Sequence, residues 1–130
     1  MRGTIALQLP WPPVTANQYW KVWRGRAVLN PLAKAYRQQI YHDFHTRAGF
    51  GDKRLAVVIY ITPPNNRAFD IDNHAKIPID TLEYAGWFEN DSQIDQLFVA
   101  RLPANKENPG LLVQISEVDA RDGDTSDNEG

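Results

Sequence analysis

The stretch Leu55-Ala56-Val57-Val58-Ile59-Tyr60-Ile61-Thr62 is an apolar run rich in β-branched residues. Such residues fit the pleated surface of a sheet, and a short continuous apolar run is consistent with a buried strand. Pro63 and Pro64 follow at once, and proline cannot donate to a sheet ladder. The sequence therefore predicts a buried strand that ends at Thr62.

The chain after this strand predicts one helix and two further strands. A helix is expected from about Asp72 to Tyr84, closed by Gly86. Pro78 lies inside this span and should bend the helix, because proline removes a backbone hydrogen bond. The last two strands are expected at Ile94 to Leu102 and at Leu111 to Val118, where β-branched and aliphatic residues recur.

The chain before the buried strand predicts a strand, a hairpin or basic loop, and a helix. Thr4 to Leu9 alternates apolar and polar residues, which is typical of a strand. Gln18 to Leu29 surrounds a basic Arg24-Gly25-Arg26 turn. Asn30-Pro31 is typical of an N-cap followed by the first helical residue, and Gly49 is a candidate stop signal.

Together these elements predict an α+β fold, a single domain with a mixed sheet of about four to five strands and two helices packed on it. A chain of 130 residues with 42% hydrophobic content is long enough for one such core. We place the domain at residues 1–118. Residues 119–130 carry five acidic side chains and almost nothing to bury, so they should form an acidic disordered tail.

The composition also limits the cellular setting. The chain has no cysteine, which agrees with a reducing compartment. It has no N-terminal signal pattern and no apolar run long enough to span a bilayer. We therefore expect a soluble, cytoplasmic protein.

Three carboxylates and one ammonium point to a metal-assisted reaction. Asp70 and Asp72 lie just before Lys76, and Asp91 follows the predicted helix. Crowded carboxylates repel one another, so a fold that gathers them usually holds a hard divalent cation, with Mg²⁺ the common choice for phosphate chemistry. The alternatives are a solvated acidic surface, a helix cap by Asp72 or Asn73, or a simple ion pair between Asp72 and Lys76.

Charge is divided sharply along the chain. Residues 1–69 contain ten Lys or Arg against two acids, whereas residues 70–95 contain seven acids against one lysine. This division suits a polyanionic substrate: the basic surface would bind it, and a metal at the acidic site would cut it. The candidate phosphate contacts are Arg24, Arg26, Lys34, Arg37 and Arg67.

The chemistry that these residues support is hydrolysis of a phosphodiester. A metal held by Asp70, Asp72 and Asp91 would polarise the phosphate and acidify a water, and Lys76 would stabilise the charge of the transition state. His74 should project elsewhere and serve packing or capping. The alternatives are a phosphoaspartyl phosphatase, a DNA-binding module without catalysis, and a nuclease acting on RNA or on branched DNA generally.

Several motifs in order resemble the RusA family of Holliday junction resolvases, which are small endonucleases common in prophages. They are Leu9-Pro10-Trp11-Pro12-Pro13, Arg24-Gly25-Arg26, Asp70-x-Asp72-Asn73-x-x-Lys76, and Ala85-Gly86-Trp87-Phe88 with Asp91. The resemblance runs from about residue 4 to residue 118. Two departures are Asn90, where the family often has an acid, and the combination of His74 with Pro78.

The resemblance implies a Mg²⁺-dependent homodimer, in which Mn²⁺ should substitute, that nicks two opposing strands of a four-way DNA junction. It implies that Asp70, Asp72 and Asp91 bind the metal and act in catalysis together with Lys76. Hydrolysis should leave 5′-phosphate and 3′-hydroxyl ends. DNA recombination and repair are the corresponding cellular processes.

Overall fold

The structure is a computed structural model that describes residues 3–118. The expected tail at residues 119–130 lies outside the described residues, so its disorder stays a prediction.

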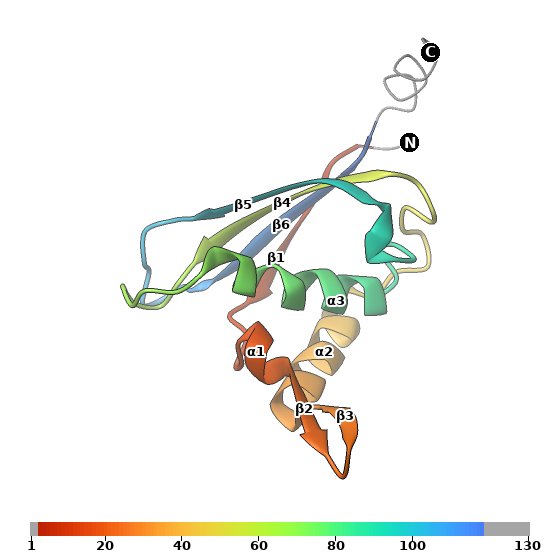
Figure 1. Cartoon of the computed structure of the whole chain (residues 1–130). Helices are drawn as coiled ribbons and strands as arrows, with labels where there is room; N and C mark the ends of the chain where they lie inside the picture. The colour runs from red at the N-terminus through yellow and green to blue at the C-terminus, as the bar shows by residue number, and fades with distance from the viewer. Residues whose placement is uncertain (1–2, 119–130) are drawn as a thin grey trace, which may run out of the picture.

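Four strands form one mixed sheet, as expected. Its order is β1 (Ile5–Pro10), β6 (Gly110–Glu117), β4 (Leu55–Thr62) and β5 (Ile94–Arg101), as Figure 1 shows. β4 pairs antiparallel with β6 and parallel with β5. The predicted buried strand is therefore an interior strand of the sheet.

The parallel pairing of β4 with β5 positions the acidic residues. Two parallel neighbours cannot be joined by a tight turn, so the chain must cross over one face of the sheet between them. The crossover contains the 3₁₀ helices η1 (Ile71–His74) and η2 (Asp91–Gln93) and, between them, the helix α3 (Lys76–Tyr84). Every predicted metal ligand and Lys76 belong to this one connection.

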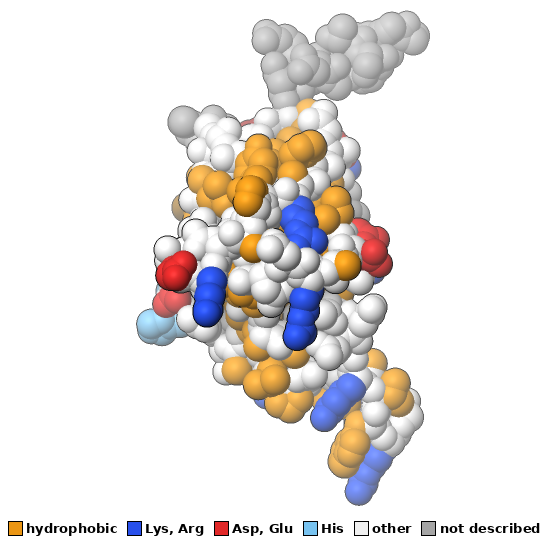
Figure 2. Space-filling view, turned by 90° about the vertical axis from the view of Figure 1, so that its left-hand side faces the viewer, with side chains coloured by type: hydrophobic (Ala, Val, Ile, Leu, Met, Phe, Trp, Pro, Cys, Tyr) orange, Lys and Arg blue, Asp and Glu red, His pale blue; other side chains and the backbone are white. Residues whose placement is uncertain are grey.

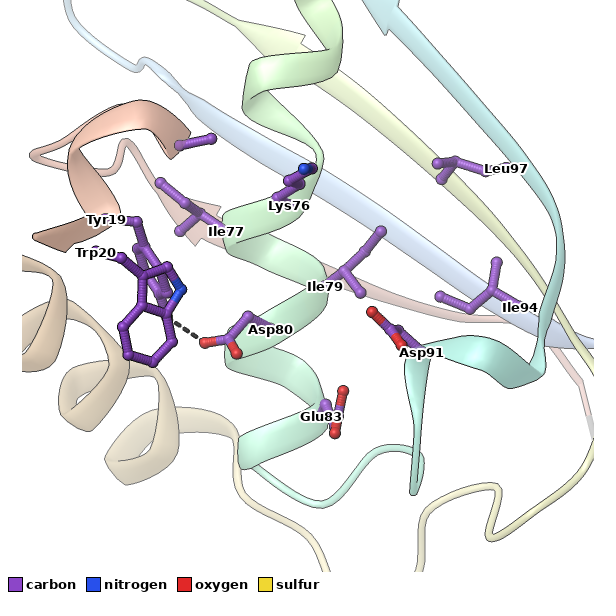
Figure 3. Close-up of a pocket in the computed structure, with 11 residues that line it drawn as sticks. Tyr19, Trp20, Lys76, Ile77, Ile79, Asp80, Glu83, Asp91, Ile94 and Leu97 are labelled. Carbon is purple, nitrogen blue, oxygen red and sulfur yellow. Dashed lines mark hydrogen bonds between the residues drawn. The ribbon is translucent and has the colours of Figure 1, made fainter. Parts of the chain in front are cut away.

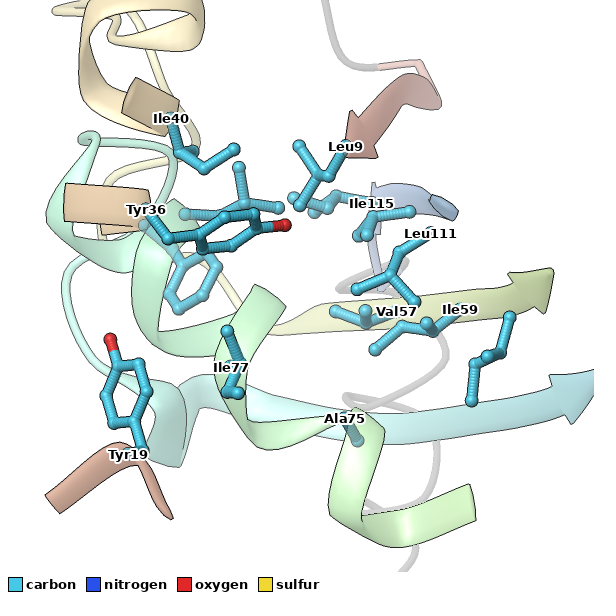
Figure 4. Close-up of a cluster of buried hydrophobic side chains, with 14 of the residues drawn as sticks. Leu9, Tyr19, Tyr36, Ile40, Val57, Ile59, Ala75, Ile77, Leu111 and Ile115 are labelled. Carbon is cyan, nitrogen blue, oxygen red and sulfur yellow. The ribbon is translucent and has the colours of Figure 1, made fainter. Parts of the chain in front are cut away.

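Two main helices, α2 (Pro31–Phe44) and α3, lie on one face of the sheet and enclose the core. The α+β prediction is confirmed. In Figure 4 the sheet residues Leu9, Ile59 and Ile115 face side chains of these helices, among them Ile40 and Ile77. All five are at most 2% exposed, and each such burial contributes about 1.5–3 kcal/mol to folding.

Helix α2 begins as expected and ends earlier than expected. The Asn30 side chain accepts a hydrogen bond from the Leu32 amide at 2.9 Å, and Pro31 is the first helical residue. The prediction of a stop at Gly49 was wrong, because the helix ends at Phe44. The carbonyl of Phe44 accepts a hydrogen bond from the Trp87 indole at 2.8 Å, which replaces a bond of the helical ladder.

The expected continuous helix from Asp72 to Tyr84 is instead a 3₁₀ turn followed by a separate helix. The Ala75 amide bonds to the Asp72 carbonyl, which is 3₁₀ pairing, and α3 begins only at Lys76. Pro78 is thus in the first turn of α3, where a helix leaves its amides without helical partners. The prediction that Pro78 lies in the interior of a longer helix was therefore wrong. Gly86 closes the helix as expected, at a φ of 95° that favours glycine.

The basic segment is a hairpin, not a loop. The short helix α1 (Ala16–Tyr19) leads into β2 (Trp20–Trp23) and β3 (Arg26–Leu29), which pair antiparallel as a separate two-stranded sheet. Arg24 and Gly25 form the turn with φ values of 52° and 74°, as two-residue hairpin turns require. The hairpin projects from the body, away from the main sheet (Figure 1).

The second face of the main sheet is open within residues 3–118, where no helix covers it. The rings of Tyr60 and Phe98 pack edge to face on neighbouring strands there, with centroids 6.2 Å apart. None of the helices between residues 3 and 118 is both long and apolar enough to cross a membrane.

Candidate active site

One face of α3 carries charged side chains at helical spacing. Lys76 begins the helix and is exposed, and Asp80 and Glu83 follow four and seven residues later. Residues at this spacing lie one above another on a helix. Asp80 and Glu83 were not among the predicted site residues, although this spacing from Lys76 was visible in the sequence.

These three side chains line a pocket of about 440 Å³, which we call the Lys76 pocket. Figure 3 shows α3 between Tyr19 and Trp20 on one side and η2 with β5 on the other. The structure thus brings Lys76 and Asp91, two of the predicted catalytic residues, to one hollow. The lining residues are Ala16, Tyr19, Trp20, Lys76, Ile77, Ile79, Asp80, Glu83, Asp91, Ile94 and Leu97.

Asp91 is held in place by its neighbours. The buried Gln93 amide oxygen accepts hydrogen bonds from the backbone amides of Glu89 and Asn90, both at 2.9 Å. The Gln93 amide nitrogen donates to the carbonyls of Gly51 and Lys53, at 2.9 and 2.6 Å. Asn90 accepts from the Ser92 amide at 2.8 Å and so caps η2. The family departure at Asn90 therefore has a structural role here.

Asp70 lies at a second hollow of about 410 Å³, lined also by Thr15, Asn17, Asn73 and His74. Asp72 is exposed in η1. The interpretation of Asp72 or Asn73 as a helix cap was wrong. The cap positions of η1 and α3 are Asp70 and Ala75, and neither makes a side-chain capping bond.

The predicted metal ligands have suitable chemistry but are not gathered. Asp70, Asp72 and Asp91 are exposed, and no ion pair of residues 3–118 engages them. Their oxygens are the hard ligands that Mg²⁺ prefers. Within the described residues, no three Asp, Glu or His side chains lie close enough together to hold a metal ion. Lys76 likewise forms no ion pair with Asp72 in this part of the chain.

His74 has the packing role that was expected. Its ring is buried between Trp11 and Phe69, with centroids 5.2 and 4.4 Å away. Burial, followed by the nearby charge of Arg101, lowers the pKa of His74. The ring therefore favours its neutral form and anchors η1 to the loop that precedes α1.

Asp80 joins α3 to the end of α1 and to α2. It accepts a hydrogen bond from the hydroxyl of Tyr19, the residue just before β2, and it forms an ion pair with Arg37 of α2 at 3.6 Å. Burial, then the bond to Asp80, raises the pKa of Tyr19. Burial, then the charges of Asp91 and Asp80, raises the pKa of the Glu83 carboxyl.

The predicted phosphate contacts are spread over the hairpin, α2 and the loop before η1. Arg24, Arg26 and Lys34 are exposed. Arg37 is engaged by Asp80 and lies over the Tyr84 ring at 4.4 Å, and exposed Arg67 accepts a bond from Arg101 at its carbonyl. Figure 2 shows Lys and Arg side chains beside hydrophobic ones on the projecting hairpin.

Comparison with known proteins identifies the family. The sequence model of the family Endodeoxyribonuclease RusA matches residues 10–116. The chain is 31% identical over 108 residues to the crossover junction endodeoxyribonuclease RusA of Escherichia coli strain K12, covering 80% of this chain and 88% of that protein. It is 32% identical over 118 residues to the enzyme of the same name from Enterobacteria phage HK97, covering 86% and 93%. The chain therefore belongs to the RusA family of crossover junction endodeoxyribonucleases.

Proposed function

We propose that this endonuclease resolves four-way (Holliday) DNA junctions by paired symmetric nicks that leave 5′-phosphate and 3′-hydroxyl ends. Family membership supports the reaction class, and the relatives are named for crossover junctions. We assign the active site to this region because Lys76 and Asp91 line one pocket. Asp70 and Asp72 lie in the residues that lead into α3.

Nucleases of this family depend on a metal ion. We infer that the ion is Mg²⁺, with Mn²⁺ able to substitute, and that Asp70, Asp72 and Asp91 would hold it. The ion would supply polarisation of a phosphate oxygen and acidification of a water. Because the three carboxylates are not gathered in the structure, binding should draw them together.

Lys76 supplies the charge stabilisation that comes from a protein side chain and not from the metal. A phosphodiester resists attack because its oxygens are negatively charged, and further charge develops on them in the transition state. The exposed ammonium at the start of α3 can approach these oxygens and neutralise that charge. Gln93 and Asn90 hold the turn that carries Asp91, which lines the same pocket.

The basic residues supply the affinity for DNA. Arg24 and Arg26 on the hairpin, Lys34 and Arg37 on α2, and Arg67 beside η1 are the proposed phosphate contacts. Such contacts are independent of sequence and weaken with salt. The ion pair of Arg37 with Asp80 means that Arg37 must share its charge between the protein and a phosphate.

Two nicks in one junction imply two active sites. A four-way junction is nearly two-fold symmetric, so we propose a homodimer with a two-fold axis. The open face of the main sheet, with Phe98 55% exposed and Leu112 half-buried on it, is the candidate interface. Sedimentation of a monomer at micromolar concentration would contradict this.

One cleavage assay tests the whole proposal. A labelled four-way junction, a linear DNA duplex and an RNA duplex of matching sequence are incubated with the protein in Mg²⁺, in Ca²⁺ and in excess chelator. We expect cutting of the junction alone, and only in Mg²⁺, because Ca²⁺ has looser coordination geometry. Equal cutting of all substrates would favour a nuclease of broader specificity, and activity in chelator would exclude the metal.

A further inference from the structure

The Lys76 pocket has two kinds of wall that hydrolysis of a phosphodiester alone does not require. Part of its lining is aromatic and aliphatic, with Trp20 on one side of α3 and Ile94 and Leu97 of β5 on the other (Figure 3). Another part consists of the carboxylates of Asp80, Glu83 and Asp91. An occupant must satisfy both.

The carboxylates of α3 argue against a phosphate at the end of the pocket that is farther along the helix from Lys76. Asp80 is already engaged by Arg37 and by the Tyr19 hydroxyl, and phosphate oxygens brought beside the Glu83 carboxylate would be repelled by its like charge. Neutral groups with N–H donors are attracted instead, because a carboxylate accepts their hydrogen bonds. The edges of nucleobases carry such amino and imino donors.

Trp20 offers the matching flat surface. It is 52% exposed although it lines a pocket, which is unusual for an indole that serves only the core. The Tyr19 ring packs edge to face against the Trp20 ring, with centroids 5.9 Å apart. Tyr19 is in turn hydrogen-bonded to Asp80, so the indole packs against an anchored side chain. A rigid exposed aromatic ring is the platform on which unpaired bases stack.

We propose that the Lys76 pocket binds one unpaired nucleobase of the DNA substrate, stacked on Trp20 and hydrogen-bonded to the carboxylates of α3. This rests on the proposed nuclease function, because Lys76 at the same pocket would then contact the phosphate next to that base. Enzymes that act within a paired helix gain selectivity for branched DNA when a base must leave the stack, because bases at a branch leave it most readily.

Trp23 provides the matched control. It lies on the same strand, is 57% exposed, and points to the opposite side from Trp20, since side chains alternate along a strand. The guanidinium of Arg24 covers its ring at 4.5 Å, and Trp23 is not among the residues that line the pocket. Loss of either tryptophan removes similar exposed aromatic area, but only one removes the platform.

The test measures the affinity of wild-type and variant proteins for four-way junctions in metal-free buffer. One junction is intact, and each of the others carries one abasic site, placed at a different position near the branch. We expect Trp20→Ala to weaken junction binding by on the order of tenfold, Trp20→Phe to restore part of it, and Trp23→Ala to change it little. One abasic position should weaken binding of the wild-type protein equally and should weaken Trp20→Ala no further, because the two losses share one contact.

Three results would overturn the proposal. Trp20→Ala and Trp23→Ala could weaken junction binding equally, or the losses of affinity caused by the abasic site and by Trp20→Ala could simply add. In the third result, no abasic position in the junction would weaken binding by the wild-type protein. The last arm does not depend on whether a variant folds. A change of sedimentation in Trp20→Ala without the abasic coupling would show that a second copy of the chain covers the pocket. Cutting by the wild-type protein in Mg²⁺ is scored separately, so failure of the nuclease function is distinguishable.

Discussion

Replacing Gln93 by Ala should lower both the free energy of unfolding and the rate of cleavage, because the substitution removes four hydrogen bonds. The Gln93 amide makes four hydrogen bonds to backbone groups, two to amides on the loop before Asp91 and two to carbonyls of residues 51 and 53. The Gln93 side chain is 5% exposed, so these bonds are partly shielded from water. Alanine leaves all four groups without their partner.

The expected size follows from these groups. Each buried polar group that loses its partner costs about 1–3 kcal/mol, and water that enters at the loop should recover part of this. We therefore expect a loss of about 3 kcal/mol, which corresponds to a melting temperature roughly 10 °C lower in a domain of this size. Asp91 lies two residues away, and a displacement of about 1 Å at a catalytic group costs on the order of a hundredfold in rate.

Urea denaturation and single-turnover cleavage of a four-way junction measure the two losses on the same preparations. Gln38→Ala is the control, because Gln38 is an exposed glutamine on α2. It should change the free energy of unfolding by less than about 0.5 kcal/mol. A loss below about 1 kcal/mol for Gln93→Ala, or normal cutting by a clearly destabilised variant, would refute the reasoning.

Three further predictions concern other parts of the molecule. Tyr19→Phe removes the bond to the Asp80 carboxylate and should lower the free energy of unfolding by about 1.5–3 kcal/mol in urea denaturation, whereas the exposed Tyr41→Phe should not. Glu83→Gln should stabilise the protein near neutral pH, because the pKa of Glu83 is raised in the fold and its charged form is disfavoured there. This gain should vanish as the pH falls below the ordinary carboxyl pKa of about 4, and a constant gain in urea denaturation across pH would contradict it. Deletion of residues 119–130 should leave the melting temperature unchanged and tighten DNA binding modestly at low salt, and a large loss of stability would contradict the prediction of disorder.

The sequence alone predicted the elements whose signals are local and consistent. The strand at Leu55–Thr62 is bounded by Pro63, and α2 begins after its cap at Asn30, although its end at Phe44 was not predicted. In both, backbone preference and side-chain burial favour the same structure. The hairpin had a turn signal as well, although its projection from the body depends on the anchoring of Tyr19, which the sequence does not reveal.

The site was harder to predict because it depends on tertiary contacts. The 3₁₀ turn before α3 separates Asp72 from the helical face of Lys76, so the spacing argument for that pair does not hold. Asp80 and Glu83 do share that face, but their role at the pocket appears only once the hairpin and β5 close its sides. Asp91 depends on Gln93, whose bonds reach about forty residues back along the chain.

The central claim is that the acidic crossover between β4 and β5, together with Lys76, cuts DNA. The most direct measurement is the single-turnover cleavage rate of a four-way junction in Mg²⁺ by Asp70→Asn, with junction affinity in metal-free buffer and melting temperature measured alongside. We predict that cleavage falls by several orders of magnitude, about 4 kcal/mol or more of transition-state stabilisation, while binding holds or tightens because a negative charge is removed. Cleavage at near the wild-type rate, with any effect confined to the melting temperature, would contradict the account.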